Sequence, residues 1–197
     1  MMTVTQDGGP FEFTPENRAE ADKHIAKYPD GRQKSAVMPL LWLAQRQNGG
    51  WLSREAIEYV AGVLDMPTIK VLEVATFYTM YNLRPVGRYH IQLCGTTPCW
   101  LRGADTVLKA CYDFGLEKGK VTHDGRFSLI EVECLGSCCN APTVQINDDY
   151  YEDLDYQSMS RILESLARGE TPPPGSQRGR RSSEPEGGLT SLTEVDQ

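Results

Sequence analysis

Residues 88–115 read RYHIQLCGTTPCWLRGADTVLKACYDFG, a strand pattern and a helix pattern joined by a loop with two cysteines. In residues 88–94 apolar side chains occupy alternate positions, which is typical of a β-strand. Residues 99–115 have apolar side chains at helical spacing and end at a glycine, which predicts one helix. A strand that leads directly into a helix predicts a sheet with helices packed against it.

The sequence that follows extends this pattern. Residues 123–134 (HDGRFSLIEVEC) place an Asp124-Gly125 turn before a second alternating strand. Residues 143–153 (TVQINDDYYED) predict a hairpin, and residues 155–168 predict a final helix with one buried stripe. That stripe comprises Met159, Ile162, Leu163 and Leu166. The order β-α-β-β-α predicts a small sheet with helices packed on it, within an α+β fold.

The first part of the chain, up to about residue 81, is predicted to be helical throughout. Thr14 and Ser53 are the expected N-caps of two helices, a strongly apolar helix lies between them, and a fourth runs from Thr68 toward Phe77. Several short helices in succession indicate a small bundle. A helix-turn-helix DNA reader is the alternative, but acidic residues leave the candidate recognition helices without a basic face. These residues are Glu55, Glu58, Asp65 and Glu73.

The composition of the 197 residues limits the classes of function. A net charge of −7 argues against a nucleic-acid partner, because binding phosphates requires an excess of Lys and Arg. The first residues lack the basic segment and the apolar segment that make up a secretory signal. The longest apolar run, residues 36–44, is too short to span a membrane. We therefore expect a soluble intracellular protein with no direct membrane insertion. In that compartment cysteines serve more often as ligands or core residues than as disulfides.

One of the six cysteines is explained by packing. Cys111 shares one helical face with apolar residues, and a buried cysteine behaves as a small hydrophobic side chain. The other members of that face are Trp100, Ala104, Val107, Leu108 and Phe114. Cys111 is therefore predicted to lie in the core.

The other five cysteines fall into two loops, each at the end of a predicted strand. The first loop contains Cys94 and Cys99 as C-x4-C, and the second contains Cys134, Cys138 and Cys139. Two such loops meet if their strands are neighbours. Four converging thiolates repel one another unless a metal neutralises them, so this pattern predicts a metal or cluster site. By spacing alone, either Cys138 or Cys139 could pair with Cys134.

The loop lengths favour an iron–sulfur cluster over zinc. Structural zinc sites usually use C-x2-C pairs, whereas a [2Fe–2S] cluster distributes four cysteines over two irons. Small and hydroxyl-bearing loop residues also allow hydrogen bonds to the sulfurs. These are Gly95, Thr96, Thr97, Gly136 and Ser137. A zinc-stabilised interaction module is the alternative. The sequence contains no C-x-x-C redox motif and no nucleotide-binding motif, so we expect no catalytic residues in this chain.

Two long segments resemble a known family. Residues 77–104 (FYTMYNLRPVGRYHIQLCGTTPCWLRGA) and residues 132–154 (VECLGSCCNAPTVQINDDYYEDL) are similar to the thioredoxin-like [2Fe–2S] subunits of respiratory complex I, NADH:quinone oxidoreductase. The likeness extends from about residue 35 to about residue 168. Residues 179–192 (GRRSSEPEGGLTSL) also resemble the C-terminal arm of these subunits.

The resemblance implies an N-terminal helical bundle followed by a thioredoxin-like domain. It implies one [2Fe–2S] cluster held by four ligands: Cys94, Cys99, Cys134 and Cys138. It further implies that the cluster exchanges single electrons with the FMN of a partner flavoprotein subunit that oxidises NADH. The chain alone would then contain no complete active site. Other peripheral-arm subunits would be further partners.

The resemblance also implies a location and an alternative assembly. The chain would lie in the bacterial cytoplasm or on the matrix side of an organelle, peripheral to the inner membrane through its complex. Related subunits occur in NAD-linked hydrogenases and formate dehydrogenases, which are the alternative within the same class. In this register Cys139 is a non-ligand thiol that we expect to pack inward, because the family usually has a small residue there.

We therefore expect three regions along the chain. Residues 1–84 form the helical region, residues 85–169 the thioredoxin-like domain, and residues 170–197 an extended tail rich in Pro, Gly and Ser. Such a tail is poor in apolar residues and cannot fold alone. It is either disordered or an arm that orders against a partner, and Leu189 and Leu192 favour the second interpretation.

Overall fold

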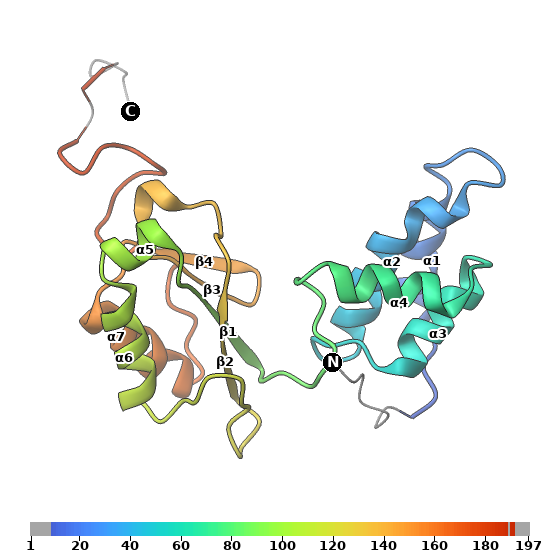
Figure 1. Cartoon of the computed structure of the whole chain (residues 1–197), viewed down its shortest axis with the longest axis horizontal. Helices are drawn as coiled ribbons and strands as arrows, with labels where there is room; N and C mark the ends of the chain where they lie inside the picture. The colour runs from blue at the N-terminus through green and yellow to red at the C-terminus, as the bar shows by residue number, and fades with distance from the viewer. Residues whose placement is uncertain (1–8, 189, 192–197) are drawn as a thin grey trace. The chain divides into compact units, whose positions relative to one another are not determined.

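The computed structural model describes residues 9–188 and 190–191. The chain divides into two units, Met1–Val86 and Gly87–Gln197. Figure 1 shows helices α1 to α4 in the first unit and the labelled strands in the second. Within the described ranges, no helix is both long and apolar enough to cross a membrane.

The first unit contains the four predicted helices. They are α1 (Pro15–Ile25), α2 (Val37–Gln47) after a 3₁₀ turn (Gln33–Ala36), α3 (Arg54–Val63) and α4 (Thr68–Phe77). Both predicted N-caps are confirmed: the Thr14 side chain accepts a hydrogen bond from the Asn17 amide, and Ser53 accepts one from the Ala56 amide. These bonds satisfy amides that have no partner within the helix.

A helical core holds this unit together. Leu40, Leu41, Ile57 and Leu64 are fully or almost fully buried among the helices. The buried side chain of Gln45 links α2 to the segment after α4. It donates to the Met80 carbonyl at 3.0 Å and accepts from the Asn82 amide at 2.7 Å. Because both ends of the amide are satisfied, its burial carries no uncompensated polar group.

The second unit contains a five-stranded sheet and two long helices. Its elements are β1 (Tyr89–Cys94), α5 (Thr97–Leu101), α6 (Ala104–Asp113), β2 (Phe127–Val132), a 3₁₀ turn (Cys138–Asn140), β3 (Val144–Ile146), β4 (Asp149–Glu152), α7 (Tyr156–Ala167) and β5 (Gly175–Ser176). The strand order is β2-β1-β3-β4-β5. β1 pairs in parallel with β2 and antiparallel with β3, and β4 pairs antiparallel with β3 and in parallel with β5.

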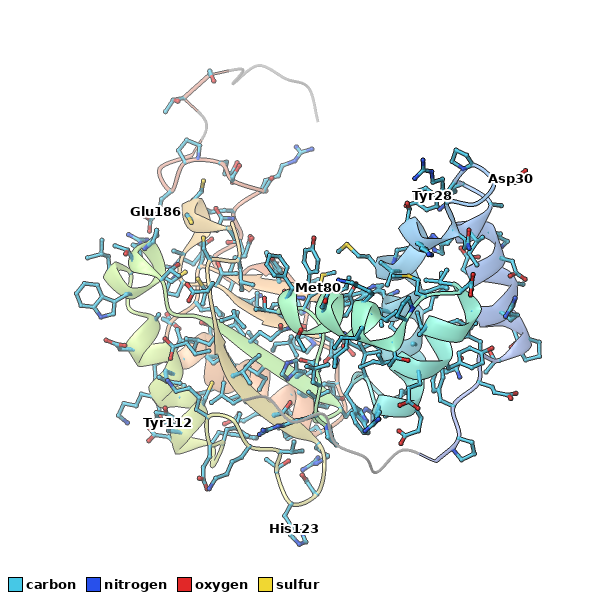
Figure 2. All side chains as sticks on the ribbon, turned by 45° about the vertical axis from the view of Figure 1, so that its right-hand side comes forward. Tyr28, Asp30, Met80, Tyr112, His123 and Glu186 are labelled. Carbon is cyan, nitrogen blue, oxygen red and sulfur yellow. The ribbon has the colours of Figure 1, made fainter. Side chains whose placement is uncertain are left out.

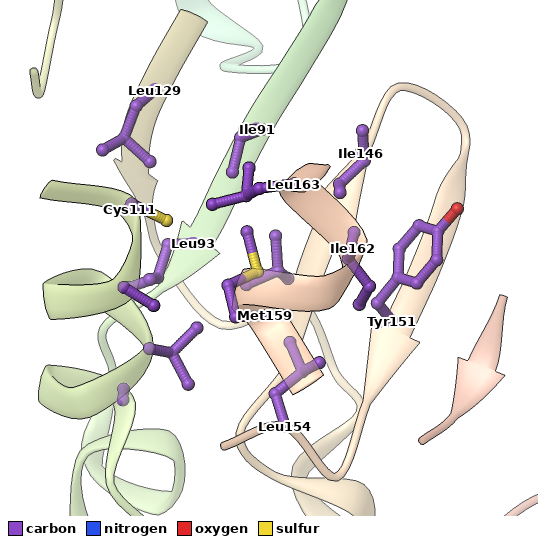
Figure 3. Close-up of a cluster of buried hydrophobic side chains, with 14 of the residues drawn as sticks. Ile91, Leu93, Cys111, Leu129, Ile146, Tyr151, Leu154, Met159, Ile162 and Leu163 are labelled. Atoms are coloured by element: carbon purple, nitrogen blue, oxygen red, sulfur yellow. The ribbon is translucent and has the colours of Figure 1, made fainter. Parts of the chain in front are cut away.

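Helices α6 and α7 pack against the sheet through one apolar core. Figure 3 shows Cys111 of α6 and Met159 and Leu163 of α7 directed toward Ile91 and Leu93 of β1. Cys111 is completely buried, so its predicted place in the core is confirmed. The predicted stripe on the last helix is likewise buried.

The helix expected over residues 99–115 is two helices. α5 ends at Leu101 and α6 begins at Ala104, with Gly103 between them at φ 98°. A side chain is strained at this backbone conformation, and glycine is not. The break also changes the direction of Trp100, which is 56% exposed rather than packed on the face of Cys111. That part of the prediction was wrong because helical periodicity was extended across a residue that ends the helix.

The described part of the tail lies against the second unit. β5 adds a fifth strand beside β4, and the Gln177 amide donates to the Glu152 carbonyl at 2.9 Å. Disorder does not fit these residues, because they are ordered against the chain's own sheet. The arm that orders against a partner stays a prediction. Leu189 and Leu192 lie outside the described residues.

Substitution by alanine should have opposite effects on stability at two glycines. A Cβ atom at Gly87 would lie 2.3 Å from the Phe127 carbonyl carbon, whereas one at the exposed helical Gly62 would meet no atom within 4 Å. We expect Gly87→Ala to destabilise the second unit by about 1–3 kcal/mol, because backbone must move. Gly62→Ala should stabilise the first unit by about 0.5–1 kcal/mol. Urea unfolding measures both, and a stabilised Gly87→Ala variant would contradict the close approach of Gly87 to the backbone of β2.

Candidate metal centre

Parallel pairing of β1 and β2 brings the two cysteine loops to one edge of the sheet. Cys94, the last residue of β1, is in register with Val132, the last residue of β2. Cys134 follows two residues later, and Cys99 lies in the first turn of α5. Because parallel strands end at the same edge, loops that are distant in the sequence become neighbours here.

The four thiols form two pairs. The Sγ atoms of Cys134 and Cys138 are 3.4 Å apart, and the Cys94 thiol acts on the pKa of Cys99. The first loop is buried and the second is exposed: Cys94 and Cys99 are almost inaccessible, whereas Cys134 and Cys138 face solvent. The centre therefore has a protein side and a solvent side.

Hydrogen bonds favour the thiolate at one cysteine of each pair. Burial acts to raise the pKa of Cys94, but hydrogen bonds from the Thr96 side chain and the Leu135 backbone lower it below its ordinary value. The pKa of Cys134 is lowered first by the Gly136 amide, which donates to its Sγ at 3.4 Å. Each loop thus donates hydrogen bonds to a sulfur, as metal-bound thiolates require.

The second cysteine of each pair holds its proton more tightly. Burial raises the pKa of Cys99 to about 12, and negative charge on Cys94 and Cys138 adds to this effect. The pKa of Cys138 is raised through its hydrogen bond to Cys134, with a further contribution from charge on Cys94. The four thiols are therefore close enough for their charges to interact. Full deprotonation of all four needs a compensating positive charge, which a metal supplies.

The donor set fits a [2Fe–2S] cluster. Such a cluster takes four cysteine ligands divided between two irons, and the two loops supply four cysteines in two pairs.

The loop that contains Cys134 and Cys138 is fixed by β4. The Tyr150 hydroxyl donates to the Leu135 carbonyl at 2.8 Å. The Glu152 carboxylate accepts hydrogen bonds from the Ser137 hydroxyl and, at 2.8 Å, from the Asn140 side chain. Sequence reasoning placed these strand residues in a hairpin and missed their contacts with the loop. No local pattern marks them, because the contacts depend on how β4 lies beside the loop.

Cys139 does not pack inward as expected. Its side chain is exposed, and its carbonyl accepts a hydrogen bond from Arg180 in the tail at 2.9 Å. Cys138 and Cys139 both belong to the 3₁₀ turn Cys138–Asn140, and both are exposed. The prediction of a buried Cys139 was therefore wrong.

A polar depression lies beside the first cysteine loop. Its volume is about 530 Å³, and residues of the loop and of β2 line it together with Lys118. A Cβ atom at Gly95 would lie 2.1 Å from a Glu131 carboxylate oxygen, so the Glu131 side chain would have to move away. Glu131 also forms an ion pair with Lys118. The wall of the depression thus carries one acidic and one basic side chain, Glu131 and Lys118.

Comparison with known proteins identifies a family and several relatives. The sequence profile of the thioredoxin-like [2Fe-2S] ferredoxin family matches residues 21–167. The chain is 58% identical over 157 residues to the E subunit of the NADH-quinone oxidoreductase of Rickettsia bellii, covering 79% of this chain and 94% of that protein. It is 56% identical over 155 residues to the corresponding E subunit of Rickettsia prowazekii, covering 78% of this chain and 88% of the relative.

A solved structure supports the fold. The crystal structure of an air-oxidised NAD⁺-reducing [NiFe]-hydrogenase superposes with a TM-score of 0.57 and 22% sequence identity. The match covers 66% of this chain and 23% of the hydrogenase chain. At this identity the likeness concerns the fold alone.

Proposed function

This chain belongs to the thioredoxin-like [2Fe–2S] ferredoxin family, and we propose that it is the electron-transfer subunit of an NADH:quinone oxidoreductase. Its [2Fe–2S] cluster would be held by Cys94, Cys99, Cys134 and Cys138. The observation that carries this proposal is the meeting of two cysteine pairs where parallel strands β1 and β2 end. Identity of 58% and 56% to the E subunits of that enzyme from two Rickettsia species supports the assembly.

When bound, the cluster would supply one-electron chemistry, because it can accept and release a single electron at a time. The chain's own residues hold it and set its electrostatic surroundings. The Gly136 amide donates to the Cys134 sulfur, and the Thr96 hydroxyl lies 3.2 Å from the Cys94 sulfur. Donors near the sulfurs favour the more negative, reduced state. Burial of Cys94 and Cys99 keeps water from that side of the centre.

A partner surface is proposed at the same end of the unit. Trp100 and Leu101, which directly follow Cys99, are 56% and 70% exposed. Large apolar side chains beside an electron carrier suit burial against a partner, because contact with the partner removes them from water. We propose that this partner is the flavoprotein subunit that binds FMN and oxidises NADH. The assembly would lie in the cytoplasm or the organellar matrix, peripheral to the inner membrane.

An equivalent subunit of an NAD-linked hydrogenase or formate dehydrogenase is the alternative assembly. The likeness to the NAD⁺-reducing hydrogenase is compatible with it, but that protein is only 22% identical to this chain. Purification of the chain from its native source distinguishes the assemblies. We expect quinone-dependent NADH oxidation in the co-purified complex, and hydrogen- or formate-dependent NAD⁺ reduction would contradict the preferred assembly.

The cofactor is tested on the full chain purified without oxygen. We expect a coloured protein with about two irons and two acid-labile sulfides per chain and an EPR signal after reduction with dithionite. A colourless protein that contains zinc and gives no EPR signal would support a zinc-stabilised module instead. Removal of the metal by a chelator should abolish the visible absorption in the same sample.

A further inference from the structure

The C-terminal segment contacts the ligand loop through Arg180. The guanidinium Nε donates to Asp153 at 2.9 Å, and Nη2 donates at 2.9 Å both to the Cys139 carbonyl and to the Asn140 side-chain oxygen. Nη1 donates at 2.8 Å to the Glu184 carbonyl. One planar side chain therefore connects the loop, the end of β4 and the tail.

The ion pair at the centre of this arrangement is buried. The side chains of Arg180 and Asp153 are 11% and 2% exposed. Ser176 of β5 donates to the Asp153 carboxylate at 2.6 Å and accepts from the Arg180 amide at 3.2 Å. Moving Arg180 away would leave the buried Asp153 carboxylate without its partner, which is strongly unfavourable. The ion pair therefore fixes the position of Arg180.

Further contacts bind the same loop to the tail and to the end of β4. The Asn140 side chain donates at 2.8 Å to the Ser182 carbonyl, and the Asp153 amide donates at 2.7 Å to the Asn140 carbonyl. A surface ion pair joins Arg178 to Glu186 in the same segment, and Glu186 is labelled in Figure 2. The tail thus adds contacts to the loop that are separate from those made by Tyr150 and Glu152.

We propose that Arg180 is a positioning residue for the cluster, which fixes the backbone of the loop that carries Cys134 and Cys138. The inference rests on the proposed ligand role of these two cysteines. Arg180 touches neither sulfur. It acts through the Cys139 carbonyl and the Asn140 side chain, which directly follow Cys138 in the 3₁₀ turn. Groups that orient ligands from outside commonly control metal retention.

Substitution by lysine tests the guanidinium fork. Arg180→Lys keeps a positive charge beside Asp153, but an ammonium group cannot reproduce the planar set of contacts with the loop. Arg181→Lys is the matched control, because Arg181 is its exposed neighbour and the chemical change is the same. In Arg180→Lys we expect loss of iron to a chelator about tenfold faster than in wild type. The EPR spectrum and the reduction potential should also change, whereas Arg181→Lys should match wild type in all three.

A second measurement uses the cluster-free chain. Amide hydrogen exchange in residues 134–140 should become faster in Arg180→Lys and stay unchanged in Arg181→Lys, while exchange in α6 is unaltered in both. This measurement does not require a bound cluster. It therefore distinguishes an error in the positioning role of Arg180 from an error in the proposed function.

Equal loop exchange and equal iron loss in the two lysine variants would overturn the role of Arg180 even if wild type contains a [2Fe–2S] cluster. A wild-type protein without iron would overturn the proposed function. Faster loop exchange in Arg180→Lys would then still show that Arg180 holds the backbone of residues 134–140, in a loop that does not bind a cluster. An effect on unfolding alone, with normal loop exchange, EPR spectrum and potential, would assign Arg180 to general stability and contradict positioning.

Discussion

Cys138→Ser is expected to lose the cluster or to alter its spectrum severely, whereas Cys139→Ser is expected to retain it. The Cys138 sulfur lies 3.4 Å from that of Cys134, and its charge acts on Cys99 in the other loop. Cys139 is exposed, and its carbonyl accepts a hydrogen bond from Arg180 in the tail at 2.9 Å. A serine hydroxyl is a much weaker ligand for iron than a thiolate, so only the first substitution should remove a ligand.

Both variants remove one thiol from neighbouring positions, so each controls for the other. Iron content, visible absorption and EPR of the two proteins, purified without oxygen, provide the measurement. Loss of the cluster in Cys139→Ser with retention in Cys138→Ser would establish the pairing of Cys134 with Cys139. Loss in both would mean that the loop itself, rather than one ligand, is sensitive to substitution.

The second large effect is a loss of folding stability in acid, caused by protonation of His90. His90 is buried, and burial lowers its pKa from the ordinary 6.5 to about 4. Its Nδ1 lies 2.8 Å from the Ser128 hydroxyl oxygen, which also accepts from the Gly87 amide. Its Nε2 is buried without a hydrogen-bond partner in the described part of the chain. Protonation would place a charged N–H in that site, which is unfavourable.

The direction of the pH effect follows from the lowered pKa. Above about pH 6.5 the His90 ring is neutral in both the folded and the unfolded chain, so protonation does not reduce the stability of the second unit. As the pH falls toward about 4, the unfolded chain binds the proton first. The free energy of unfolding should then decrease by about 3 kcal/mol. Burial acts to raise the pKa of Asp153, but hydrogen bonds from Arg180 and Ser176 lower it overall, and the Ser158 amide lowers the pKa of Asp155. These two carboxylates therefore lose their contribution only at lower pH.

Urea unfolding of the cluster-free chain at about pH 7 and about pH 4.5 measures this effect. His90→Leu should remove most of the decrease between the two pH values. His123→Leu is the control, because Figure 2 shows His123 at the tip of an exposed loop. An equal decrease in wild type and His90→Leu would show that another group causes the acid sensitivity.

Local sequence patterns predicted most of the secondary structure. The N-caps Thr14 and Ser53, the helix at Thr68–Phe77 and the buried stripe of α7 are confirmed. Each depends on residues three to seven positions apart, which a helix places together irrespective of its surroundings. The same reasoning failed at Gly103, where one residue with a left-handed conformation ended the helix.

The sequence by itself determined that two cysteine loops follow two strands and that Cys111 belongs to the core. Only the tertiary structure decided that β1 and β2 are parallel neighbours, that Cys139 faces solvent and that Arg180 reaches its carbonyl across 41 residues. The physical reason is the range of the interactions. Helical and strand periodicities report neighbours along the chain, whereas strand order and a buried ion pair depend on packing between distant segments. The cysteines could be found from their spacing, but the groups that hold their loop could be found only from the fold.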